Sequence, residues 1–181
     1  MSARSDEILD AAERLVRRAG YAAVSTRAVA EAVGIRAASL HHHYPTKSDL
    51  GEALAARYTD RFLEELGSPD AARHHPEGPI ALYCDAFRQS YKRDGALCLC
   101  GVLGAEVQSL PTPVADQARV FFKRNLNWLT EALRRPGKPP PHRDAVRILA
   151  SLEGAMMMAS ALEDASVLDT VCEDLSALQN A

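Results

Sequence analysis

"STRAVAEAVGIRAASLHHHYPTKSDL", residues 25–50, is the stretch of the sequence that decides the fold. Ser25 can accept a hydrogen bond from an unpaired N–H group at the start of a short helix that ends at Gly34, a residue type that tolerates a left-handed backbone. A second short helix is predicted over residues 37–43, because Pro45 cannot lie in its interior. Two short helices joined by a glycine-containing turn form a helix-turn-helix, whose second helix fits the major groove of DNA.

The apolar residues of this stretch suit a steep, close crossing of the two helices. Val29, Ala30, Ile35 and Leu40 supply small apolar contacts between them. Ala30 is informative, because only a small residue lets the second helix approach so closely. Leu40 and Tyr44, four residues apart, are predicted to mark the buried side of the second helix.

Helical patterns fill the rest of the chain. Ser5 is predicted to cap a first helix that ends at Gly20, whereas the polar stretch 70–79 is predicted to be a loop. We find no alternating strand pattern and no internal repeat, so the predicted fold is all-α with about nine helices. Beyond the two short helices, the expected ones cover residues 5–20, 46–66, 79–93, 98–109, 113–135, 142–163 and 166–178.

Composition is that of a soluble globular protein with no strongly basic character. The 181 residues are 47% hydrophobic, and the net charge is −3. Residues 1–50 hold seven basic and six acidic side chains, so a positive DNA-binding face must come from geometry. No apolar run approaches the ~20 residues that cross a bilayer. Residues 1–13 lack a signal-peptide core, and we therefore expect a cytoplasmic protein.

The four cysteines, Cys84, Cys98, Cys100 and Cys172, are most simply interpreted as buried, reduced thiols. Cys98 and Cys100 are two residues apart and would point to different sides of a helix. A role for either one as a redox or electrophile switch stays an alternative that keeps DNA binding.

Enzyme motifs are not supported by their surroundings. His142-Arg143-Asp144 matches the letters of a kinase catalytic loop, but no glycine-rich loop precedes it. The chain also contains no Gly-x-Ser-x-Gly. We therefore expect neither catalysis nor a cofactor.

Three adjacent histidines, His41, His42 and His43, raise the alternative of a metal site. Consecutive helical residues diverge by ~100°, so these three side chains cannot face one ion. Helical metal sites use three- or four-residue spacing, which this stretch lacks. We expect no metal; His41 and His42 should face the groove and the phosphates, and His43 the next helix. The competing hypothesis is an all-α metal- or ligand-binding protein without a role on DNA.

Several blocks occur in a characteristic order. "ILDAA", "GY", "VAEAVGI" and "SLHHHYPTKSDL" follow one another within residues 8–50. This segment closely resembles the N-terminal domain of the TetR family of bacterial transcriptional regulators. The resemblance implies a homodimer that binds a palindromic operator, and a small-molecule effector that lowers the affinity for DNA. It divides the chain into a three-helix DNA-binding domain, residues 1–48, and a helical ligand-binding and dimerisation domain, residues 49–181.

Carried over by position, the resemblance also implies contacts with DNA. Ser25, Thr26 and Arg27 would contact phosphates at the start of their helix. Tyr44 and Lys47 would contact the DNA backbone or support that contact. The family often has lysine at position 37, glycine at 38 and tyrosine at 41, so the operator sequence stays open. The residues on or beside the recognition face are Arg36, Ala37, Ala38, Ser39, His41, His42 and His43.

An effector site is expected where aromatic residues recur at helical spacing in the C-terminal part. Such stripes usually belong to the core, but the family places a pocket at this level. Aromatic walls with one or two polar groups suit a small, mostly apolar molecule. Glu106 or Glu153 could select a cation, or both could be solvated. The expected effector-binding residues are Tyr83, Phe87, Tyr91, Cys100, Phe121, Asn125, Trp128 and Met157.

The last two predicted helices are the expected dimer interface. They carry more apolar surface than one small domain needs, and Gly154, Ala155 and Ala159 would permit close helix approach. Two helices from each chain would form a four-helix bundle. The residues expected there are Val146, Leu149, Ala150, Met157, Ala161, Leu168, Val171, Leu175 and Leu178. Our preferred hypothesis, which the family resemblance implies, is a repressor that a small molecule releases from DNA.

Overall fold

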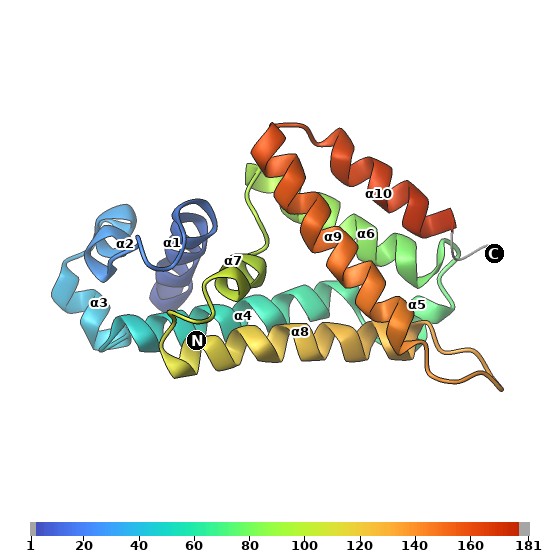
Figure 1. Cartoon of the computed structure of the whole chain (residues 1–181). Coiled ribbons are helices and arrows are strands. Elements are labelled where there is room, and N and C mark those ends of the chain that lie inside the picture. The colour runs from blue at the N-terminus through green and yellow to red at the C-terminus, as the bar shows by residue number, and fades with distance from the viewer. Residues whose placement is uncertain (1–2, 178–181) are drawn as a thin grey trace. The chain divides into compact units, whose positions relative to one another are not determined.

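The structure is a computed structural model that describes residues 3–177. This part of the chain contains ten helices and no strand, which confirms the all-α class (Figure 1). The helices are α1 (Ala3–Ala19), α2 (Thr26–Val33), α3 (Ala37–His43), α4 (Lys47–Leu66), α5 (Pro69–Arg73), α6 (Gly78–Asp94), α7 (Leu99–Ala105), α8 (Thr112–Ala132), α9 (His142–Leu162) and α10 (Ser166–Ala177).

Three details of the prediction are corrected. The stretch predicted as a loop contains α5, where the Ser68 hydroxyl accepts a hydrogen bond from the Ala71 N–H and Pro69 occupies the first turn. Ser5 lies inside α1 and does not cap it. The helix predicted over residues 98–109 ends at Ala105.

The chain forms two units, and α4 and α8 contribute to both. The first unit consists of Met1–Thr59 and Leu99–Phe121. In it α1 packs against α2 and α7, and α2 packs against α3. Ile8, Leu9 and Val29 are completely buried there. A side chain at Gly51 would collide with Tyr21 and Val114, so only glycine permits this close approach.

The second unit consists of Asp60–Cys98 and Phe122–Ala181, as far as it is described. Its core forms where α6, α9 and α10 pack together, with α9 and α10 joined as a helical hairpin (Figure 1). In length and hydropathy, α9 would also suit a membrane span. Seven of its side chains are buried in the described structure, however, so packing in the core accounts for its apolar character.

Candidate functional site

The turn between α2 and α3 is built as the sequence predicts. The Ser25 hydroxyl accepts a hydrogen bond of 3.1 Å from the Ala28 N–H and so caps α2. Gly34 ends the helix with a φ of 75°, where glycine carries no steric penalty. The Ile35 N–H then donates to the Ala30 carbonyl at 3.0 Å. Both ends of α2 are therefore fixed before the recognition helix begins.

The inner side of α3 is anchored by Leu40 and Tyr44, as expected. Leu40 is fully buried, and Tyr44 is 8% exposed. The Tyr44 hydroxyl lies 2.6 Å from the Ser5 hydroxyl of α1. Beyond α3, Thr46 and Asp49 exchange hydrogen bonds that cap α4. These contacts fix which side of α3 points outward.

The outer side of α3 is exposed and carries hydrogen-bonding groups. Arg36 is the residue that precedes the helix, and its side chain makes no capping hydrogen bond. His41 has Nδ1 3.1 Å from the Pro45 carbonyl oxygen. His42 and His43 meet edge to face at 5.8 Å, and His43 is half-buried. The exposed residues of this face are Arg36, Ala37, Ala38, Ser39, His41 and His42.

The residues that are predicted to contact phosphates have different surroundings in the structure. Ser25 already caps α2, and Thr26 is half-buried. Arg27 pairs with Glu31 on the exposed side of α2, with Nε 2.9 Å from the carboxylate.

No group of three possible metal ligands exists among residues 3–177, so the histidine triplet has no partners there for a metal site.

A carboxylate from outside the helix-turn-helix holds the turn between α1 and α2. The Glu106 carboxylate, directly after α7, accepts hydrogen bonds from the N–H groups of Tyr21 (3.1 Å) and Ala22 (3.0 Å). Gly20 has a φ of 83°, and a side chain there would collide with Glu106. We call Glu106 and the two N–H groups the Glu106 clamp.

Lys47 completes the same region. Its ammonium lies 4.5 Å above the centre of the Tyr21 ring and donates to the Ala22 carbonyl at 3.2 Å. The Tyr21 hydroxyl donates to the Lys47 carbonyl at 3.0 Å. Partial burial lowers the pKa of Lys47, and the negative charge of Glu106 opposes this shift. The sequence analysis predicted that Lys47 contacts the DNA backbone or supports that contact. It contained no signal that Glu106 holds the turn, because 85 residues separate Glu106 from Tyr21.

Known proteins share this architecture and part of the sequence. A family model described as bacterial regulatory proteins, tetR family, matches residues 8–54. A TetR transcriptional regulator from Legionella pneumophila is 29% identical, with 98% of each chain covered and a TM-score of 0.89. A TetR-family regulator from Agrobacterium tumefaciens is 27% identical, with 96% of each chain covered and a TM-score of 0.86.

Residues 8–54 match the tetR family model, and the chain has the fold of TetR-family regulators. Members of this family are DNA-binding transcriptional regulators and not enzymes. The reduced form of NemR from E. coli is 19% identical over 94% of each chain, with a TM-score of 0.73, and shares the fold. No curated protein matches the chain significantly.

In TetR-family regulators the C-terminal part is typically the ligand-binding domain, and in this chain several expected effector residues meet there. The Tyr83 hydroxyl donates to Asn125 Oδ1 at 2.6 Å in the core of the second unit. The Tyr83 ring lies 5.5 Å from Phe87 and 5.7 Å from Trp128. Phe62, which the sequence analysis did not single out for the effector, meets Tyr83 and Phe87 edge to face at 5.7 Å. We call Phe62, Tyr83, Phe87, Asn125 and Trp128 the aromatic cluster.

Other expected effector residues lie elsewhere. Tyr91 is half-buried and donates to the Ala159 carbonyl at 3.0 Å. Phe121 and Cys100 are buried in the first unit, where Phe121 packs on Tyr58 at 5.9 Å. Met157 is 53% exposed on α9. Helical spacing was the reason to expect these residues at one site. It shows that a side of a helix is buried, but not which core that side belongs to.

Glu153 of α9 has a buried polar atom that is unsatisfied, a property that it shares with Arg73 among the described residues. Its Oε1 is shielded from solvent and has no hydrogen-bond partner. Burial raises the pKa of Glu153 to about 7, while a hydrogen bond with Cys98 acts in the opposite direction. Burial also raises the pKa of Tyr83 well above its usual value, with the charge of Glu153 as a smaller cause. The Glu153 carboxyl therefore interacts with Tyr83, one member of the aromatic cluster.

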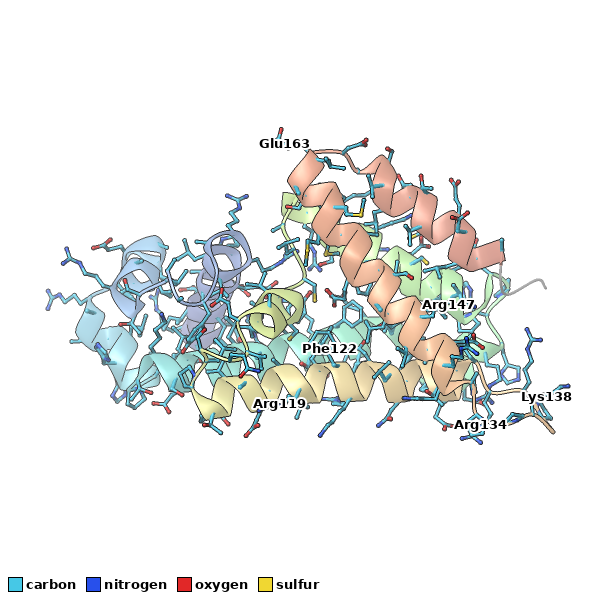
Figure 2. The ribbon with its side chains drawn as sticks, viewed as in Figure 1. Arg119, Phe122, Arg134, Lys138, Arg147 and Glu163 are labelled. Atoms are coloured by element: carbon cyan, nitrogen blue, oxygen red, sulfur yellow. The ribbon has the colours of Figure 1, made fainter. Side chains whose placement is uncertain are left out.

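A separate cavity of about 510 Å³ lies around the loop that joins α8 and α9. Figure 2 shows Lys138 in this loop and Arg147 on α9. The cavity has an apolar floor that includes Ile80 and Ile148, and Asp144 is its one acidic lining residue. Its basic lining residues are Arg135, Lys138, Arg143 and Arg147.

The residues expected at a dimer interface divide into two groups. Leu149, Leu168 and Leu175 are at most 4% exposed within one chain, so they pack in its own core. Ala155 and Ala159 are also buried, and Val171 is half-buried. Leu178 lies outside the described residues. The exposed members of the set are Val146, Ala150, Met157 and Ala161, all on α9.

Proposed function

We propose that this protein is a one-component repressor that binds a palindromic operator as a homodimer and leaves it when a small molecule binds. The main support is the geometry of α3. Leu40 and Tyr44 hold its inner side, and its outer side exposes Arg36, His41 and His42. A helix held in this way can enter the major groove, where side chains distinguish the base pairs.

We assign DNA binding to residues 1–48, and effector binding and dimerisation to residues 49–181. Ser25, Thr26 and Arg27 would bind phosphates at the start of α2, and Tyr44 and Lys47 would support the phosphate contacts beyond α3. Operator DNA is the proposed partner and the cytoplasm the proposed location. The soluble, DNA-binding character of the family supports both assignments.

The proposed dimer interface is the outward side of α9, continued by α10. A stripe of exposed apolar side chains runs along α9, with Met157 53%, Met158 55% and Leu162 62% exposed. A side chain at Gly154 would meet open space, so a second helix could approach closely there. Large exposed apolar patches are typical of protein interfaces. Apposed α9–α10 hairpins would bury this stripe in a four-helix bundle.

Selection of bound fragments from a random DNA pool tests the proposal. Enrichment of an inverted repeat is expected, because a two-fold symmetric dimer presents two identical recognition helices. The selection is run with and without EDTA. Failure to enrich any sequence would contradict the DNA-binding role. Enrichment that EDTA abolishes would support the metal hypothesis for His41, His42 and His43 instead.

A further inference from the structure

Two carboxylates are candidates for recognising a charged effector, and the structure distinguishes them. The Glu106 oxygens accept hydrogen bonds from the Tyr21 and Ala22 N–H groups, so this carboxylate is already engaged by the protein. Glu153 has a buried oxygen with no hydrogen-bond partner. A buried carboxylate is costly unless it is paired and hydrogen-bonded, so Glu153 either holds a proton or awaits a partner.

The groups around Glu153 indicate what that partner is. Tyr83 of α6 and the thiol of Cys98 interact with it electrostatically, and neither group is basic. The Tyr83 ring in turn packs on Phe87 and Trp128 and meets Phe62 edge to face. A carboxylate that interacts with Tyr83, on which other aromatic rings pack, suits an organic cation, because rings attract positive charge and cover the apolar part of the molecule.

We propose that Glu153 and the aromatic cluster bind an organic ammonium ion with an apolar body, and that such a cation is the effector. This proposal rests on the proposed function and names the ligand class of its effector site. The ammonium would donate to the unpartnered Glu153 oxygen. The aromatic side chains are buried, so the ligand must part them as it enters. A neutral analogue would leave the carboxyl unpaired, and an anion would be repelled.

The chain contains one tryptophan, and this residue gives a direct measurement. Trp128 belongs to the aromatic cluster, with its indole N–H donating to the Gly67 carbonyl at 2.8 Å. Its fluorescence therefore reports changes at the proposed site. The probes are 4-phenylbutylamine, 4-phenylbutan-1-ol and 4-phenylbutanoate, which share one carbon skeleton and carry a positive, zero and negative charge. Each is titrated at pH 8 into the full chain.

The amine is expected to change the Trp128 fluorescence and raise the melting temperature, and to bind at least tenfold more tightly than the alcohol. Glu153→Gln should remove this preference, because the amide keeps the size but not the charge. Glu163→Gln is the matched control. Glu163 is an exposed glutamate at the C-terminal end of the same helix (Figure 2). This variant should bind the amine as the unaltered protein does.

Equal binding of amine and alcohol, or amine binding that survives Glu153→Gln, would overturn the proposal. Preferential binding of 4-phenylbutanoate would also overturn it and would point to the basic cavity between α8 and α9. DNA release is measured separately with the selected operator. A protein that binds the amine as expected but never binds DNA would refute the proposed function and leave the cation site intact. Amine binding without release of bound DNA would refute the effector role alone.

Discussion

Arg36 and Lys47 lie on either side of α3 in different environments. Arg36 is exposed immediately before the helix, whereas the Lys47 ammonium contacts the Tyr21 ring and the Ala22 carbonyl. Arginine can bind guanine through two hydrogen bonds, while a lysine that contacts phosphate carries no sequence information. We therefore assign base recognition to Arg36 and general affinity to Lys47.

Replacing these two residues should have different effects on operator binding. Arg36→Ala should cost ~1–3 kcal/mol of binding free energy and relax the preference at one position in each half-site. Lys47→Ala should weaken all sequences about equally and reduce the dependence on salt by about one unit of slope. DNA selection followed by fluorescence anisotropy at several salt concentrations measures both effects. An unaltered selected sequence with Arg36→Ala would exclude the base-reading role.

His41 and His42 are expected to make operator binding depend on pH. Both side chains are exposed on the outer face of α3. Imidazole gains its charge near neutral pH, and nearby phosphates favour the charged form. Affinity should therefore be higher at pH 6 than at pH 8, with a steeper salt dependence at pH 6. The double variant His41→Gln/His42→Gln should lose most of this difference while staying folded and dimeric. A pH-independent affinity of the unaltered protein would contradict this role.

Glu153 should make the stability of the fold depend on pH. Its pKa rises from an ordinary 4.5 to about 7 on folding, so the folded chain retains a proton that the unfolded chain has lost between these values. Stability from this group is complete below about pH 4.5 and falls as pH rises towards 7, by an amount on the order of 3 kcal/mol. Tyr83 and Cys98 are the titratable groups that interact with it.

Urea unfolding at pH 5, 6, 7 and 8 tests this stability effect at a fixed protein concentration. Glu153→Gln should remove the fall, so the variant gains stability relative to the unaltered protein as pH rises. Glu163→Gln, an exposed change on the same helix, serves as the control. Parallel pH profiles of Glu153→Gln and the unaltered protein would show that the carboxyl is not buried as described.

Among the helices, those with local signals were the most predictable. The ends of α2 and α3 are marked by Ser25, Gly34 and Pro45, and both helices begin and end where the sequence predicts. The missed helix α5 carries a comparable signal, Ser68 followed by Pro69, but it is only five residues long and so too short to show an apolar period. The Glu106 clamp could not be predicted, because a carboxylate that binds backbone N–H groups leaves no pattern at the residues it holds.

The Glu106 clamp should influence DNA binding through the turn that leads into α2. Glu106→Ala leaves the Tyr21 and Ala22 N–H groups without their acceptor and should destabilise the fold by ~1–3 kcal/mol. It should also weaken operator binding severalfold, because Ser25 and Thr26 directly follow this turn. Glu106→Gln keeps one acceptor oxygen and should lie between alanine and the unaltered protein. Thermal unfolding and anisotropy measure the two effects. Equal values for all three proteins would show that the clamp is dispensable.

For the molecule as a whole, apolar periodicity identifies the side of a helix that is covered but not what covers it. From the sequence pattern, we expected Leu149, Leu168 and Leu175 at the dimer interface together with Val146 and Met157. In the structure the three leucines are buried within one chain, whereas Val146 is 43% and Met157 53% exposed. The exposed group is therefore the part of the pattern that we assign to the proposed dimer interface.

The dimer should therefore depend on the exposed apolar stripe of α9. Met157→Glu combined with Leu162→Glu should produce folded monomers, because each dimer would bring together four uncompensated charges in a surface that is now apolar. Val120→Glu is the control, since Val120 is an exposed apolar residue on α8, 37% accessible, outside this stripe. Light scattering measures the mass, and circular dichroism confirms that the helices remain.

Loss of the dimer should also remove most of the affinity for the palindromic operator. A monomer presents one α3 to one half-site and lacks the gain in effective concentration that joins the two binding events. The double variant should therefore bind a full operator no better than a single half-site, while Val120→Glu keeps the difference between them. A double variant that stays dimeric would place the interface on another surface. A monomer that still prefers the full operator would show that dimerisation on DNA uses contacts beyond α9.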